Sequence, residues 1–270
     1  MPAIVSDTMD VNHEIETNLH GRVIIVTGGT RGIGLGIVRV LARAGAKLMI
    51  TGRKPARLEA VSEELTSQGV AHATMAADVG ESGTAAAVSS ATLEAFGQID
   101  GLVANAQSFR PVTPLADVTE ADFDLVLETG PKGTLFLMQA VLPAMREQGR
   151  GRIVTFGSSM GSTGAPGYGP YSAAKEAVRS LTRTAAREWG QDGITVNCVC
   201  PASVAHRMPV GDENSERARA FAEMYKDHPL GRDGDPEVDI APVVAFLLSD
   251  ASQYMTGQTF MVDGGGIMRA

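Results

Sequence analysis

The chain has 270 residues, 44% of them hydrophobic and 20% charged, and its formal net charge at pH 7 is −8. Such a composition supports a folded core and argues against a disordered, collagen-like or coiled-coil chain. Nucleic acids and anionic membranes attract basic surfaces, so the negative charge argues against both as partners and favours chemistry on a small molecule.

The first 20 residues are expected to form an N-terminal extension, and residues 21–270 one domain. The extension lacks the basic start and following apolar stretch that would mark a secretory signal. No apolar run approaches the roughly 20 residues that span a bilayer. We therefore expect a cytoplasmic protein with no membrane partner.

From residue 22 onward, short β-rich runs alternate with longer segments of helical periodicity. This alternation is typical of a parallel sheet with helices on both faces. The predicted fold class is α/β, a Rossmann-type doubly wound sheet of seven parallel strands. The predicted strands span residues 22–27, 47–51, 70–76, 99–105, 152–156, 194–199 and 258–262.

The segments between these strands carry helix signals. Pro55 suits the first turn of a helix that Gly69 can end. Two longer helices are predicted at about residues 120–148 and 169–190. Residues 202–235 contain no strand signal and follow a strand end, where ligands bind in open α/β sheets, so we predict a substrate lid there.

A glycine-rich turn, GGTRGIG, follows the first predicted strand directly and precedes a helix. Glycines permit a tight turn and a close approach of the backbone to a pyrophosphate, and the N–H groups at the helix start favour its charge. The alternative is a turn without a ligand, which the flanking strand and helix disfavour. The predicted dinucleotide contacts in this turn are Gly28, Thr30, Arg31, Gly32, Ile33 and Gly34.

The end of the second predicted strand indicates which dinucleotide binds. Folds that bind NAD place an acidic residue there to hold the ribose 2′-hydroxyl, but this chain has Arg53. Arg53 and Arg31 could hold a 2′-phosphate through charge-assisted hydrogen bonds, and the alternative is that both are ordinary solvated arginines. Because the acid is also missing, we predict NADP(H) as the cofactor.

A second motif carries groups suited to proton transfer. Tyr171 and Lys175 are four residues apart in a predicted helix, so their side chains can share one face. A nearby ammonium stabilises a phenolate, which suits a phenol that donates a proton to a developing alkoxide. The structural alternative is a packed tyrosine and a solvated lysine. Ser158 follows the end of the fifth predicted strand, thirteen residues before Tyr171, where its hydroxyl can polarise a carbonyl group.

In this order, the glycine turn, Ser158, Tyr171 and Lys175 resemble the short-chain dehydrogenase/reductase family over residues 19–266. The resemblance implies that Tyr171 is the general acid in reduction or the base in oxidation, that Lys175 holds the nicotinamide ribose and that Ser158 orients the substrate. It also implies a homo-oligomer, a tetramer or dimer, built partly from the two long helices. Further matches are Asp78-Val79, Asn105-Ala106, Asn197, Pro201 and TGQTFMVDGGG, and the implied cofactor contacts outside the glycine turn and Arg53 are Asp78, Val79, Asn105, Ala106, Tyr171, Lys175, Pro201 and Val204.

The chain departs from the family pattern at Gly130, which takes the place of an active-site asparagine. In the family this position helps to hold a water on a proton relay to the lysine, partly through its backbone carbonyl. Glycine keeps that carbonyl. We therefore predict a modified relay and keep Gly130 among the catalytic positions.

Two further departures fall near the predicted pocket. Gln107 stands where the family usually has glycine, and His206 stands where it commonly has a threonine that touches the nicotinamide amide. Gln107 is expected near the pocket or as a partly exposed strand-end residue, and His206 is expected to contact cofactor or substrate or to lie on the lid. The predicted substrate pocket comprises Gln107, Ser159, Met160, Tyr168, His206 and Met208.

The two cysteines, Cys198 and Cys200, lie two residues apart in a predicted strand and therefore point to the same face. This spacing provides no disulfide framework and is consistent with a reducing compartment. A pair of small buried side chains is the interpretation we favour over a two-ligand metal site, and we predict no metal.

The predicted function is that of an oxidoreductase transferring hydride between NADP(H) and a ketone, an aldehyde or a secondary alcohol, with Tyr171 as acid or base. The residues expected near the pocket also include Phe109, Val204, Met224 and Tyr225, and a mostly apolar or aromatic lining suits an uncharged carbonyl compound of moderate size. A second hypothesis is an NADP(H)-binding regulatory or scaffold protein with weak or no catalysis, which Gly130 supports and the intact Ser158, Tyr171 and Lys175 oppose. Lyase chemistry without a nicotinamide is a third, which the retained glycine turn disfavours.

Overall fold

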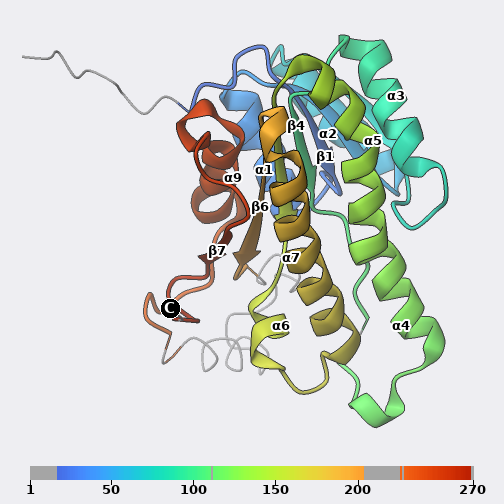
Figure 1. The fold of residues 1–270 in the computed structure, drawn as a ribbon, viewed down its shortest axis with the longest axis vertical. Helices are drawn as coiled ribbons and strands as arrows, with labels where there is room; N and C mark the ends of the chain where they lie inside the picture. Colours follow the sequence, from blue (N-terminus) through green and yellow to red (C-terminus); the bar gives the residue numbers. More distant parts are fainter. Residues whose placement is uncertain (1–16, 111, 204–225, 227, 269–270) are drawn as a thin grey trace, which may run out of the picture.

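The computed structural model describes residues 17–110, 112–203, 226 and 228–268 (Figure 1). Within these ranges the strands form one parallel sheet in the order β3-β2-β1-β4-β5-β6-β7. This confirms the predicted Rossmann-type fold, and each strand ends within two residues of its predicted bounds. The strands are β1 (Val23–Thr27), β2 (Lys47–Gly52), β3 (His72–Ala76), β4 (Gly101–Ala104), β5 (Gly151–Phe156), β6 (Ile194–Pro201) and β7 (Thr259–Val262).

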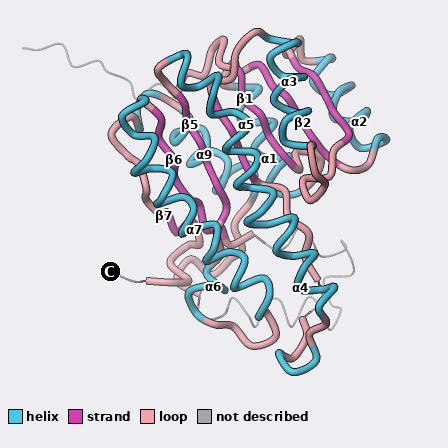
Figure 2. Tube along the Cα trace, turned by 45° about the vertical axis from the view of Figure 1, so that its right-hand side comes forward, coloured by secondary structure: helices cyan, strands magenta, loops and turns pink. Residues whose placement is uncertain are grey.

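Helices cover both faces of the sheet, as the tube in Figure 2 shows. One face packs against α1 (Gly32–Arg43), α2 (Pro55–Ser67) and α9 (Ala241–Leu248). The other packs against α3 (Thr84–Phe96), α5 (Gly133–Gln148) and α7 (Gly169–Trp189). None of the helices in the described ranges is long and apolar enough to cross a membrane.

The two-sided core follows from the alternation of side chains along each strand. In β1, Ile24 and Val26 belong to the cluster beneath α1 and α9, whereas Ile25 belongs to the cluster beneath α5 and α7. Successive strand residues point to opposite faces, so a strand covered on both sides must be apolar throughout. All five residues of β1 are buried accordingly.

The order of the strands creates a switch point between β1 and β4. β1 pairs with β2 on one side and with β4 on the other, so the chain leaves the sheet in opposite directions after these two strands. In open α/β sheets, ligands bind beyond the carboxyl ends of the strands at such a point. The two short helices α4 (Glu120–Leu127) and α6 (Ser159–Thr163) lie beyond this edge (Figure 1).

At the amino ends of the strands, opposite the switch point, Asp100 connects neighbouring strands. Its side chain is buried, with the residue only 4% exposed. Its carboxylate accepts hydrogen bonds from the backbone N–H of Val23 at 2.8 Å and from the guanidinium of Arg150 at 2.5 Å. Arg22 lies 3.6 Å away. One buried carboxylate thus connects the segments that start β1, β4 and β5, and its charge is paired, as burial requires.

The long helix predicted at residues 120–148 is interrupted. Between α4 and α5, residues Glu128–Lys132 form a π-helical turn that contains Pro131. Proline has no N–H to donate and its ring clashes with the preceding turn, so an α-helix cannot continue through it undistorted. The N–H of Gly133 instead bonds to the carbonyl of Glu128, five residues earlier. Such π turns are frequent at functional sites.

Candidate active site

The glycine turn between β1 and α1 is as tight as its sequence predicts. Gly28 and Gly32 have positive φ angles of 67° and 52°, where a side chain would be strained. A Cβ on Gly34 would lie 2.2 Å from the backbone oxygen of Gly28, so this position excludes every other residue. No side chain caps the start of α1. Its first N–H groups are therefore oriented to receive an anion such as a pyrophosphate.

Asn105 lies at the carboxyl end of β4 and ties that strand to the glycine turn. Its side-chain amide donates to the backbone oxygens of Thr27, at 2.9 Å, and Gly28, at 3.4 Å. The hydroxyl of Thr27 in turn accepts from the backbone N–H groups of Asn105 and Ala106, both at 3.1 Å. Asn105 is thus engaged with the turn backbone, and Thr27 is a site residue that the sequence reasoning missed. A buried threonine at a strand end was the available signal.

A basic residue stands at the end of β2, next to the glycine turn. Gly52 lies against Thr30, because a Cβ on Gly52 would be 2.8 Å from the Thr30 methyl group. Arg53 follows, 57% exposed, with its guanidinium 3.6 Å from the carboxylate of Asp78. Asp78 also accepts from the N–H of Gly80 at 3.0 Å. The structure therefore brings the turn, Arg53 and Asp78 to one edge, with an arginine where NAD-binding folds carry an acid.

Ser158 and Tyr171 are carried by α6 and α7, which two hydrogen bonds hold against the end of β5. Ser158 is 8% exposed and caps α6, where its Oγ accepts from the N–H of Met160 at 3.2 Å. The Nζ of Lys175 donates to the backbone oxygen of Phe156 at 2.8 Å, and the Oγ of Ser172 donates to that of Met160 at 3.0 Å. These anchors lie two residues on either side of Ser158. They hold the first turns of α7, with Tyr171, against it.

The ammonium of Lys175 is almost completely buried, with the residue 6% exposed. It lies 5.5 Å from the centre of the Tyr171 ring, in the range of a cation–π contact. Lys175 is therefore not the solvated lysine of the structural alternative. The two groups share one face of α7, as their spacing predicts.

Aromatic side chains surround the phenol. The ring of Phe109 stands nearly perpendicular to that of Tyr171, at 85° and a centroid distance of 5.3 Å, and lies 5.9 Å from the ring of Tyr168. Edge-to-face pairs at such distances are favourable. A small hollow beside them is closed by the ion pair of Arg110 and Asp122, at 2.9 Å. Its lining is Phe109, Arg110, Thr113, Val118, Asp122, Val126, Gly167, Tyr168, Pro170 and Tyr171.

The two departures from the family pattern, Gln107 and Gly130, meet in space. A Cβ on Gly130 would lie 2.7 Å from the Nε2 of Gln107 and 3.5 Å from the Cβ of Ala174. Both polar atoms of the Gln107 side chain are buried and lack a hydrogen-bond partner within the described residues. The carboxamide of Gln107 therefore fills the space that a side chain at position 130 would take.

The remaining predicted site residues are only partly accounted for. Pro201 ends β6, and Val79 packs against α5, since a Cβ on Gly133 would be 2.8 Å from the Val79 backbone oxygen. Ile33 packs against the core beneath α1. Ser159 and Met160 begin α6 beside Ser158. The predicted contacts Val204, His206 and Met208, with most of the predicted lid, lie outside the described residues.

Cys198 and Cys200 are free thiols, 0% and 1% exposed, on the face of β6 that packs under Gly157. A hydrogen bond to Cys198 and burial both raise the pKa of the Cys200 thiol. In the described part of the chain no cluster of side chains has the composition of a metal site. The cysteines therefore serve as buried packing beneath the residue that precedes Ser158.

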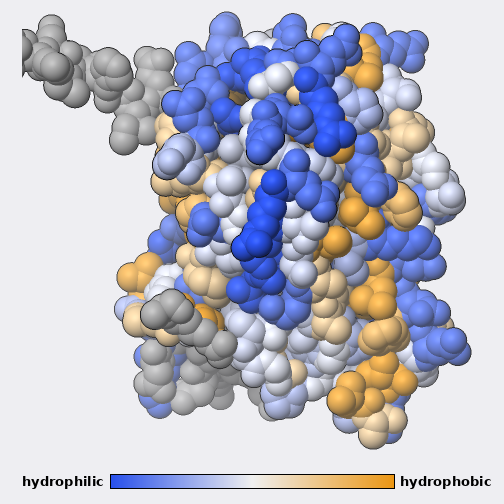
Figure 3. Space-filling model, in the orientation of Figure 1, coloured by the Kyte–Doolittle hydropathy of each residue, from blue (hydrophilic) through white to orange (hydrophobic). Residues whose placement is uncertain are grey.

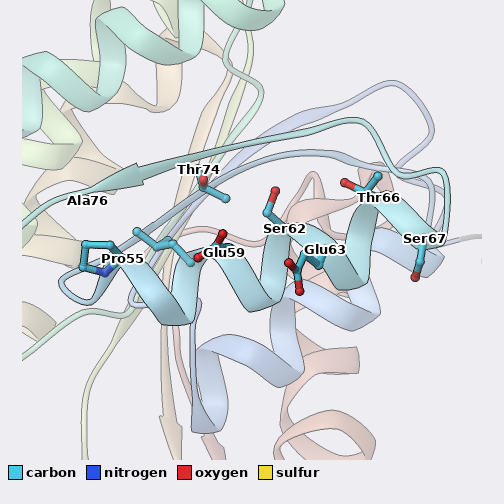
Figure 4. Close-up of a pocket in the computed structure, with 9 residues that line it drawn as sticks. Pro55, Glu59, Ser62, Glu63, Thr66, Ser67, Thr74 and Ala76 are labelled. Carbon is cyan, nitrogen blue, oxygen red and sulfur yellow. The ribbon is translucent and has the colours of Figure 1, made fainter.

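A large open cleft of about 750 Å³ lies elsewhere, between α2 and the edge strand β3 (Figure 4). Glu59, Ser62 and Glu63 project from α2 towards it, and Thr74 borders it on β3. None of the candidate site residues lines this cleft. Its two carboxylates would repel a phosphate group, so we do not regard it as the cofactor site.

Comparison with known proteins adds independent information. A family model described as enoyl-(acyl carrier protein) reductase matches residues 28–266. The chain is 37% identical over 255 residues to a 12alpha-hydroxysteroid dehydrogenase from a Clostridium species, covering 91% of this chain and 96% of that protein. Among solved structures, one described as a short-chain alcohol dehydrogenase from Sinorhizobium meliloti has a TM-score of 0.86 and 35% identity, covering 93% of this chain and 98% of the other. Levodione reductase has a TM-score of 0.83 and 35% identity, with 91% and 97% covered.

Proposed function

Since this chain belongs to the short-chain dehydrogenase/reductase family of oxidoreductases, we propose that it transfers hydride between NADP(H) and the carbon of a ketone, an aldehyde or a secondary alcohol. The observation that carries this proposal is the anchoring of α7 on both sides of Ser158, which holds Tyr171 and Lys175 against the carboxyl end of β5. The chain keeps both a dinucleotide cradle and a proton donor at one edge of the sheet.

The residues at this edge fit NADP(H). The glycine turn can pack tightly against itself and the end of β4 because Gly28 and Gly34 carry no side chain, and the uncapped start of α1 suits the charge of a pyrophosphate. Arg53 and Arg31 would hold the 2′-phosphate, and Asp78 would orient Arg53. Lys175 would contact the nicotinamide ribose. When bound, the reduced cofactor supplies hydride.

The protein's own residues would manage the proton. In reduction, the substrate oxygen gains negative charge, and the phenol of Tyr171 donates its proton to that oxygen. Ser158 orients the carbonyl by donating a hydrogen bond to the same oxygen. The ammonium of Lys175, 5.5 Å from the Tyr171 ring, stabilises the phenolate that remains. In oxidation the same groups act in reverse.

The aromatic rings around Tyr171 favour an uncharged substrate with a flat apolar body. Phe109 and Tyr168 present apolar faces beside the phenol. A 12alpha-hydroxysteroid dehydrogenase is among the similar proteins, and its name indicates a steroid substrate. We therefore propose a cyclic ketone or alcohol ahead of a charged acyl compound.

We also propose a homo-oligomer. The helices α4 and α5 expose the apolar side chains of Phe123 and Phe136, 40% and 48% exposed. In Figure 3 apolar surface gathers over this side of the molecule. Exposed apolar clusters of this kind mark association surfaces. Sedimentation velocity would distinguish a dimer or tetramer from a monomer.

The test of the function is spectroscopic. Oxidation of NADPH and of NADH would be followed with a panel of cyclic ketones, linear ketones and aldehydes. We expect turnover that favours NADPH and falls at least about a hundredfold in Tyr171→Phe, because the proton donor is lost. Tyr254→Phe, which alters a fully exposed tyrosine, is the matched control. Tight NADPH binding without turnover of any compound in either direction would favour the regulatory alternative.

A further inference from the structure

The two polar atoms of the Gln107 side chain are buried, but the side chain has no role in the proton transfer proposed above. Gln107 lies just after the end of β4. The backbone next to it is held in place, because the N–H of Ser108 donates to the Oγ of Thr129 at 3.0 Å. Thr129 immediately precedes Gly130 in the π turn. This hydrogen bond fixes the backbone beside Gln107 so that the carboxamide of Gln107 lies against Gly130.

Because the polar atoms of this carboxamide are buried, they are expected to have hydrogen-bond partners. A glutamine side chain has two N–H donors and an acceptor oxygen, and buried polar groups are almost always hydrogen-bonded to protein or to ordered water. Neither Nε2 nor Oε1 of Gln107 has a partner within the described residues. A water molecule that bridges them to another polar group would satisfy both.

Lys175 is the candidate for that other group, because it follows Ala174, which lies against the same space. Its ammonium has three donors and is buried, and within the described residues it gives one hydrogen bond, to the carbonyl of Phe156. Ala174, the residue before it, lines the same small space as Gln107 and Gly130. An ammonium at this depth needs further acceptors, and the carboxamide lies towards the same part of α7.

We infer that Gln107 is a positioning residue, which holds a buried water beside the ammonium of Lys175, and that residue 130 is glycine because the carboxamide occupies its side-chain space. The inference rests on the proposed function, since the water hydrates the ammonium of Lys175, the group that stabilises the phenolate of Tyr171. The water leaves Lys175 charged and fixed while Tyr171 exchanges its proton.

Gln107→Met is the first test, because methionine keeps the volume of the side chain and removes both hydrogen-bonding atoms. We expect kcat to fall about tenfold, with the KM of the ketone and the Kd of NADPH unchanged, since a displaced catalytic group loses turnover before binding. Unchanged kcat would reduce Gln107 to packing. A raised KM with unchanged kcat would make it a substrate contact, and either result overturns the inference.

A swap of the two residues tests the occupied space. Gly130→Asn alone should lower the Tm, because its Cβ would meet Nε2 of Gln107 at 2.7 Å. Adding Gln107→Gly removes that clash and supplies a carboxamide from the other side, so the double variant should recover both Tm and kcat. If Gly130→Asn proves as stable as the double variant, the carboxamide does not fill this space.

A crystal structure separates this inference from the proposed function. In the wild-type protein we expect a water hydrogen-bonded to both Gln107 and Lys175, and in Gln107→Met we expect that water to be absent. Its absence from the wild type would overturn the inference even if ketones turn over. Its presence would support the inference even if no ketone in the panel is a substrate.

Discussion

The guanidinium of Arg53 lies 3.6 Å from the carboxylate of Asp78, so the ends of β2 and β3 carry a weak, exposed ion pair beside the glycine turn. An exposed pair of this kind contributes little to stability. In the proposed function, the pair keeps a basic side chain at a position where an acid would select NAD.

Arg53→Ala should therefore weaken NADPH binding about 10- to 100-fold, because a charge-assisted hydrogen bond is worth roughly 1.5–3 kcal/mol. NADH has no 2′-phosphate, so its affinity should not change. Titrations of cofactor fluorescence with both nucleotides would measure the difference. Arg146→Ala is the matched control, since Arg146 is also about half exposed and paired, with Asp192 at 2.8 Å. Equal losses for both cofactors would contradict the assignment.

Gly34→Ala should damage both stability and cofactor binding. The added Cβ would lie 2.2 Å from the oxygen of Gly28 and 2.7 Å from the amide nitrogen of Asn105, and neither can withdraw without distorting the turn. We expect a loss of about 1–3 kcal/mol in the free energy of unfolding, measured by urea titration, and weaker NADPH binding. Gly190→Ala, where no atom lies within 4 Å of the new Cβ, should be neutral or slightly stabilising. Similar losses for both variants would argue against a special role of the turn.

Acid should weaken the segment that starts α9. Hydrogen bonds from Arg232 and from the N–H of Asp235 lower the pKa of Asp239 to about 2, from an ordinary value of 3.8. A depressed carboxyl pKa stabilises the fold fully above the unfolded value, and this contribution is lost as pH falls through the folded value. The Tm difference between wild type and Asp239→Asn should thus be largest above pH about 4 and vanish near pH 2. A Tm difference that does not change with pH over this range would show that the Asp239 carboxylate does not stabilise the fold in this way.

The two thiols should be inert in the folded protein. Cys198 and Cys200 are fully buried, so reagents cannot reach either thiol, even though the hydrogen bond between them lowers the pKa of Cys198 while it raises that of Cys200. A chromogenic disulfide reagent should therefore label neither thiol under native conditions and both in guanidinium chloride. Rapid labelling of the native protein would show that this end of β6 opens.

The fold could be predicted closely because its signals are local. Runs of apolar β-branched residues, the glycine turn and the four-residue spacing of Tyr171 and Lys175 each depend on the backbone of one segment. The anchoring of Lys175 on Phe156 adds a contact that no spacing reveals. The role of Arg53 in cofactor choice remains a prediction.

The features that sequence reasoning could not resolve depend on contacts between separate segments of the chain. Gln107 and Gly130 looked like separate departures, and only the packing of the β4 end against the π turn shows that one side chain fills the place of the other. The interruption of the 120–148 helix was missed in the same way, since prolines are also tolerated within helices, as Pro143 is in α5. Asn105 remains a predicted cofactor contact, and the bond from its amide to the turn backbone is a second interaction that its sequence position did not reveal.

The buried carboxylate of Asp100 has a consequence for how this protein can change over generations. It ties the starts of three strands together at the edge farthest from Tyr171, and none of the candidate site residues takes part in that network. Loops at the carboxyl edge can therefore be rebuilt for a new substrate while the opposite edge keeps the sheet in register. Selection for substrate specificity and selection for a stable fold therefore act on opposite ends of the same strands.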